Sequence, residues 1–208
     1  IAGDRVPLHG GRSVTVDFLG HPAPFPQGPW LLAGLLALGE TRLSEGRLLA
    51  PALDNADHYF RQVLALDEDN AQAADGLQRV LQARIQQYLD LAEQRLGEGL
   101  LILPEDDSAV HYFRQVLGWE PDNLLALAGI NRVAQRFIDQ SEAAYARREY
   151  NLALEHIKQG LEAEPDNERL LALYDSHEQR VRQAANRPRS AQPAQQNPIK
   201  RLLNNLFD

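Results

Sequence analysis

The sequence predicts an all-α fold, an α-solenoid of three helical hairpins with a capping helix. The first observation is a duplication, because the heptapeptide His-Tyr-Phe-Arg-Gln-Val-Leu begins at His58 and recurs unchanged from His111, 53 residues later. The second is a shorter third copy, in which Glu-Pro-Asp-Asn occupies 120–123 and again 164–167, 44 residues later. The third is apolar spacing with the 3.6-residue period of helices between about residues 30 and 185. A fixed period of this length is typical of repeat architectures, whose neighbouring units cover each other's apolar faces.

Composition narrows the class of protein. The chain has 208 residues, of which 44% are hydrophobic and 24% charged, as in ordinary soluble globular proteins. The absence of cysteine excludes disulfides, thiol nucleophiles and cysteine-ligated zinc. A net charge of −8 argues against nucleic acid as a partner. Because the chain starts at Ile1 and holds no methionine, we expect a processed product or a piece of a longer protein.

Residues 1–29 differ from the rest and predict an irregular arm with a short strand. Residues 14–18, Val-Thr-Val-Asp-Phe, alternate in the way of a strand. Residues 21–29 contain four prolines, which exclude a helix interior and favour extended loop geometry.

The repeat domain is predicted over residues 30–185. A first helix starts near Pro29 and is broken by Gly46 and Pro51, and a second runs from about Asp54 to Ala65 with Asp54 or Asn55 as its cap. After a turn at 67–70, the pattern fits either one long helix to about Leu96 or two helices jointed near Gln82.

The remaining elements repeat this order and end in a tail. We expect helices at 107–118, 123–147, 151–163 and 166–185, with a tight turn at 147–150. Residues 186–208 predict a disordered basic tail, because few apolar side chains are available for a core. Its end, Ile199–Phe207, is amphipathic and suggests weak contact with a membrane or a partner.

The third unit resembles the tetratricopeptide repeat family. Residues 134–167 are 34 residues long, with Ala153 where two helices approach closely, Ile157 four residues later and Pro-Asp-Asn at 165–167. The two earlier units carry the same pair of positions: Ala56 with Phe60, and Ala109 with Phe113. They depart from the family in extra loops at 46–53 and 99–106, and in Glu68 where proline is usual.

This resemblance implies a concave face that binds an extended peptide or a helix of a partner protein. The partner-binding residues it implies are Gln82, Ile85, Leu89, Gln135, Ile138 and Glu142. The alternative for Ile85, Leu89 and Ile138 is that they form the core between hairpins. The family's two-carboxylate clamp has no counterpart here. The predicted function is a non-catalytic protein–protein interaction scaffold.

The first 35 residues resemble a second family. Gly-Asp-Arg at 3–5, Val-Asp-Phe-Leu-Gly at 16–20 and Phe-Pro-Gln-Gly-Pro at 25–29 are similar to one block of the lysophospholipid-type acyltransferases, closest to the lipid A lauroyl branch. The motif residues are Asp4, Arg5, Phe25, Pro26 and Gly28, and the resemblance implies that the last three shape an acyl-acceptor pocket.

The catalytic part of that family is missing from the chain. The family uses a His with an acid five residues later, whereas Val14 follows His9 and Pro26 follows His21 at that distance. The alternative function is therefore a piece of a membrane-associated lipid acyltransferase whose catalytic block lies outside this chain; chance similarity in an N-terminal arm is a third possibility.

Metal and cofactor sites are not predicted. His58, His111 and His156 occupy equivalent helix positions, but no second ligand stands at the spacing that a metal needs, so we expect packing or surface roles. We expect no cofactor, no nucleic acid and a protein or peptide partner. The resemblances imply a bacterial protein of the cytoplasm or the inner-membrane periphery, with the periplasm as the alternative.

Overall fold

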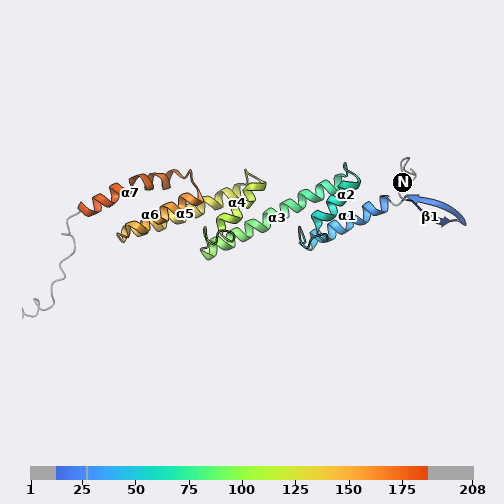
Figure 1. Cartoon of the computed structure of the whole chain (residues 1–208), viewed down its shortest axis with the longest axis horizontal. Coiled ribbons are helices and arrows are strands. Elements are labelled where there is room, and N and C mark those ends of the chain that lie inside the picture. Colours follow the sequence, from blue (N-terminus) through green and yellow to red (C-terminus); the bar gives the residue numbers. More distant parts are fainter. Residues whose placement is uncertain (1–12, 27, 187–208) are drawn as a thin grey trace, which may run out of the picture. The chain divides into compact units, whose positions relative to one another are not determined.

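The computed structural model describes residues 13–26 and 28–186, and confirms the all-α class (Figure 1). A short hairpin of β1 (Ser13–Phe18) and β2 (His21–Pro26) precedes the helices, which are α1 (Gly28–Ser44), α2 (Ala56–Leu66), α3 (Ala71–Glu98), α4 (Ala109–Trp119), α5 (Leu124–Ala146), α6 (Tyr150–Ala163) and α7 (Glu168–Asn186). None of these helices is long and apolar enough to cross a membrane.

The chain divides into two compact units. The first unit holds the residues up to Gln94 together with Arg114–Pro121. The second unit holds Arg95–Phe113 together with the residues from Asp122 onward. Each unit is described by itself below.

The hairpin corrects the expectation that residues 21–29 are loop. β1 and β2 pair antiparallel, and the turn residues Leu19 and Gly20 have φ of 53° and 79°, as a two-residue type I′ turn requires. Pro29 lies in the first turn of α1, where proline is tolerated, and the other three prolines do exclude a helix over β2. They permit a strand because the three of them at 22, 24 and 26 are two residues apart, so that all fall in non-hydrogen-bonded pairs of the ladder.

The core of the first unit is built around Phe60 of α2, which is fully buried. Its ring lies against Gly39 of α1 and Gly76 of α3; a Cβ atom added at these glycines would lie 2.7 Å and 2.5 Å from a ring carbon. The two glycines therefore let two helix backbones approach the same ring. The buried cluster around it comprises Leu48, Ala56, Phe60, Val63, Ala73 and Val80.

Helix α3 settles the question of one helix or two, because it is continuous from Ala71 to Glu98. The residues around the expected joint, Leu81 to Arg84, are strong helix formers without glycine or proline, so no local signal ends the helix there. Helix α5 is likewise continuous over Leu124–Ala146.

The second unit repeats the same packing with one more helix. Phe113 of α4 is fully buried and lies in contact with the position of Gly129 in α5, the counterpart of the Phe60–Gly76 pair 53 residues earlier. Helices α5, α6 and α7 share a second buried cluster of Ala134, Ile138, Ile157, Leu170 and Leu173. The close-approach position Ala153 is fully buried, as expected from the sequence.

Candidate functional site

The duplicated loops form the most distinctive feature of the described chain. The first repeat loop (residues 45–55) joins α1 to α2, and the second repeat loop (residues 99–108) joins α3 to α4. Their backbones follow the same path: Ala56 N donates to Arg47 O and Ala109 N donates to Leu100 O, both at 2.9 Å. The sequence shows these loops only as additions to the repeat. The structure shows that each is an ordered element.

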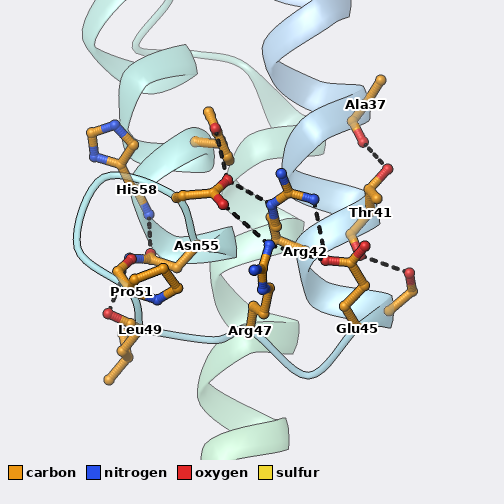
Figure 2. A network of polar contacts seen from close by, with 12 residues as sticks. Ala37, Thr41, Arg42, Glu45, Arg47, Leu49, Pro51, Asn55 and His58 are labelled. Atoms are coloured by element: carbon orange, nitrogen blue, oxygen red, sulfur yellow. Dashed lines mark hydrogen bonds and ion pairs between the residues drawn. The ribbon is translucent and has the colours of Figure 1, made fainter.

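Four polar side chains hold the first repeat loop, and we call them the first anchor cluster: Arg42, Glu45, Asp54 and Tyr59. Arg47 of the same loop also pairs with Asp54 at 3.1 Å and with Glu45 at 3.5 Å (Figure 2). Arg42 Nε donates to Asp54 Oδ1 at 2.6 Å, and Tyr59 Oη donates to the same oxygen at 3.0 Å. Arg42 Nη1 also pairs with Glu45 Oε2 at 3.1 Å. The cluster thus ties the end of α1, the end of the loop and the start of α2 together.

The second anchor cluster, Arg95, Glu98, Asp107 and Tyr112, reproduces this geometry 53 residues later. Arg95 Nε donates to Asp107 Oδ1 at 2.7 Å, Tyr112 Oη donates to that oxygen at 2.8 Å, and Arg95 Nη1 pairs with Glu98 Oε2 at 2.9 Å. All four residue types are identical in the two copies. The duplication therefore preserves these four residues and their bonds, whereas Arg47 has no counterpart because Leu100 stands at the equivalent position.

The residue after each aspartate caps the following helix. Asn55 Oδ1 accepts from His58 N at 2.8 Å, and its Nδ2 donates to Leu49 O and Pro51 O at 3.0 and 2.8 Å (Figure 2). Of the two caps considered from sequence, Asn55 is thus the one used, because Asp54 is engaged by Arg42. In the second copy Ser108 Oγ accepts from His111 N at 3.3 Å.

Electrostatics fix the protonation of both clusters. The hydrogen bond from Arg42 holds the pKa of Asp54 below its usual value, and the hydrogen bond from Arg95 does the same for the pKa of Asp107. The bond to Asp54 raises the pKa of Tyr59. A carboxylate kept ionised and a phenol kept protonated do not exchange protons near neutral pH. The anchor clusters therefore position the loops.

The anchor clusters predict a loss of stability in acid. Because the folded-state pKa of Asp54 and Asp107 is lowered, their contribution is complete above the unfolded value of about 3.9 and disappears as pH falls through the folded value. Urea midpoints measured from pH 6 to pH 2 should fall steeply below about pH 4. The Asp54→Asn, Asp107→Asn double variant should have a lower urea midpoint at pH 6, and its midpoint should fall less between pH 6 and pH 2. Parallel curves for the two proteins would contradict this assignment.

Both repeat loops expose apolar side chains. Leu49 and Leu53 of the first repeat loop are 44% and 73% exposed, and Leu103 of the second is 63% exposed. We call these three residues the loop leucines. Both loops thus present leucine to solvent on a backbone that is held in place, and residues that bind a partner are often carried by loops on a rigid scaffold.

The residues predicted to bind a partner divide into two groups. Ile85, Leu89 and Ile138 are only 4%, 6% and 2% exposed, which matches the alternative that they belong to the core and removes them from any open face. Gln82 and Gln135 are exposed, and Gln135 donates to Asp139 Oδ1 at 2.8 Å. The apolar members are buried because they lie on the same helix face as the core residues.

Glu142 lies beside a pocket that the sequence analysis does not predict. The pocket, of about 500 Å³, lies in the second unit between the end of α5 and the end of α7, and Tyr145, Arg148, Tyr150, Arg180 and Gln183 line it. Arg180 binds Glu142 at 3.1 Å and stacks 4.8 Å from the Tyr145 ring centre. Two arginines and two tyrosines would suit a group that carries negative charge beside an apolar part.

The acyltransferase-like motif is only partly described. Asp4 and Arg5 lie outside the described residues, as do the tail 187–208 and its Ile199–Phe207 segment. Phe25 and Pro26 end strand β2, and Gly28 is the first residue of α1.

The three equivalent histidines are half-buried and contact neighbours on their own elements or in the core. His58 Nε2 lies 3.0 Å from Gln62 Nε2, and the His111 ring meets the Tyr112 ring edge-on, with centroids 5.1 Å apart. His156 stacks obliquely on Phe137. Within residues 13–26 and 28–186, no group of three or more ligating side chains is placed to hold a metal ion.

No family model, no curated protein and no solved structure matches this chain. Both family resemblances therefore stay as expectations, and evidence about function comes from the arrangement of the chain's own residues.

Proposed function

We propose that this chain is a non-catalytic protein–protein interaction module that contacts its partner through the loop leucines, Leu49, Leu53 and Leu103. One observation carries the proposal: Asp54 and Asp107 are each paired with an arginine that holds the loop in place, while leucines of both loops face solvent. The hydrogen bonds from Arg42 and Arg95 keep the pKa of Asp54 and of Asp107 below its usual value, so both ion pairs that hold the loops persist at neutral pH.

The anchor clusters favour binding because they order the loops before a partner arrives. Ordering a loop on binding costs conformational entropy, which weakens affinity. Here Arg42–Asp54 and Arg95–Asp107, with the tyrosine hydroxyls, fix each loop against two helices. The leucines are therefore presented at little further entropic cost.

The scaffold class also agrees with the duplication itself. Two loops with the same four anchor residues each present leucine along one chain, although at different positions, since Leu53 aligns with Asp106 and Leu103 with Ala50. Linked contact points raise the affinity for an extended partner beyond that of either one. Gln82 and Gln135, which are exposed, stay as predicted additional contacts.

Site-specific photo-crosslinking tests the proposal. A benzoyl-phenylalanine placed at Leu53 or at Leu103 should give a crosslink to one and the same partner protein, identified by mass spectrometry. The same probe at Leu171 of α7, which is 42% exposed, serves as the matched control and should not. With the partner in hand, Leu53→Ser should weaken binding about tenfold.

Two results would oppose the proposal. Crosslinks from Leu171 that equal those from Leu53 and Leu103 would show that the loops have no special role. Turnover of an acyl donor by the purified chain, with no crosslinked partner, would favour the alternative of an acyltransferase piece.

A further inference from the structure

The N-terminal hairpin has one edge that cannot accept another strand. Phe18 and His21 flank the two-residue turn and form a hydrogen-bonded pair, and pairs then alternate along the ladder. The pairs Asp17↔Pro22, Thr15↔Pro24 and Ser13↔Pro26 are thus non-hydrogen-bonded, and the backbone groups of these residues point away from the hairpin. On the β2 side each of these positions is a proline, which has no N–H to donate. The outer edge of β2 is therefore closed to pairing.

The outer edge of β1 is open by the same geometry. Ser13, Thr15 and Asp17 direct their backbone N–H and C=O groups outward, and none of them is a proline. The described sheet contains β1 and β2 alone, so no described strand covers this edge. Beside it, Val14 and Val16 are 43% and 44% exposed on one face of the hairpin. An open, β-branched edge next to exposed valines is a template for strand addition.

The sequence of β1 fits a second copy of itself. In an antiparallel pairing with Thr15 opposite Thr15 of the other copy, Ser13 lies opposite Asp17, so all three outward-facing residues form hydrogen-bonded pairs. Registers shifted by two residues leave one of the three without a counterpart. In the central register Val14 lies opposite Val16, which joins the exposed valines into one apolar face, and no carboxylate faces another.

We propose that two copies of this chain associate through antiparallel β1–β1 pairing, centred on Thr15, to give a four-stranded sheet in the order β2-β1-β1-β2. The association is isologous and closes at two copies, because the proline-lined edges of β2 lie on both outer sides. A two-stranded hairpin is marginal by itself, and four strands with a shared apolar face supply the stability it lacks.

Charge pairs at the symmetry centre give a sharp test. Sedimentation velocity of the full chain should show a concentration-dependent monomer–dimer equilibrium. Thr15→Lys and Thr15→Glu each place two like charges directly opposite one another and should weaken association at least about tenfold. An equimolar mixture of the two variants places opposite charges together and should restore the dimer as a heterodimer.

Two further variants separate pairing from folding. Thr15→Pro removes the outward N–H at the centre of the edge and should abolish the dimer, whereas Thr15→Ser keeps that group and should leave the dimer intact. Recovery of the dimer in the Lys and Glu mixture shows that both hairpins are folded. The proposal is overturned by a wild-type chain that stays monomeric at all concentrations, by a dimer unaffected by Thr15→Pro, or by a mixture no better associated than its components. Strand addition by a different protein would appear as the first of these.

Discussion

Replacing Gly76 by alanine should lower the free energy of unfolding of this protein by about 2 kcal/mol. The added Cβ atom would lie 2.5 Å from the ring of Phe60. This ring is fully buried and also lies against Gly39 of α1, so it has little room to move. Overpacking of this kind costs about 3 kcal/mol at most, and the better helix propensity of alanine offsets about 1 kcal/mol of it. Urea denaturation followed by circular dichroism measures the difference.

Gly34→Ala is the matched control, because Gly34 lies in α1 with nothing within 4 Å of an added Cβ atom. That variant should be stabilised by up to about 1 kcal/mol. If packing against the ring is the cause, Phe60→Leu combined with Gly76→Ala should lose less than the sum of the two single losses. Equal effects of alanine at Gly76 and Gly34 would show that the ring does not require the glycine.

Replacing Asn55 by alanine should cost about 2–3 kcal/mol, whereas the equivalent Ser108→Ala should cost about 1 kcal/mol. Both changes remove a helix cap. Asn55 is only 4% exposed and also donates to Leu49 O and Pro51 O, so alanine leaves a loop carbonyl without its donor. The duplication thus allows two capping residues of one protein to be compared. Asn55 caps its helix and also bonds to its loop, whereas for Ser108 only the bond to the helix is seen.

Asn55→Ser, which copies the second loop, should recover the cap but not the bonds to the loop carbonyls. The free energy of unfolding of Asn55→Ser should lie between that of Asn55→Ala and that of the unaltered protein. Hydrogen exchange gives a local readout, since the amide of His58 should lose protection in Asn55→Ala and keep part of it in Asn55→Ser. Equal losses for Asn55→Ala and Ser108→Ala would show that the extra bonds contribute nothing.

Much of the helical architecture could be predicted from local signals. The expected boundaries of the helices that became α2, α4, α5, α6 and α7 agree with the structure to within about two residues, because apolar period, caps and breakers act over a few neighbouring positions. The turn at 147–150 follows from the same local signals. Arg148 in this turn has a left-handed φ of 63°, and Gly46 and Gly99 at two other helix ends have left-handed φ values of 71° and 81°.

The candidate site was predicted much less well, for a physical reason. Ile85, Leu89 and Ile138 are buried because other helices cover their face. Periodicity predicts that a helix has an apolar face, but it does not predict which other element packs against that face. The pocket at Tyr145 and Arg180 joins residues from two helices separated by α6. No local sequence pattern predicts that residues so far apart in the chain line one pocket.

The sequence by itself determined that this protein is helical, duplicated and broken by two loops, because each of these properties follows from identity between copies or from spacing along a few turns. Only the tertiary structure decided that Arg42 and Arg95 reach over their loops to Asp54 and Asp107, and that a strand rich in proline can pair along one of its edges. Both depend on groups twelve or more residues apart, or on the direction of backbone N–H groups. These contacts and backbone directions arise only when the chain folds, and they cannot be predicted from local sequence patterns.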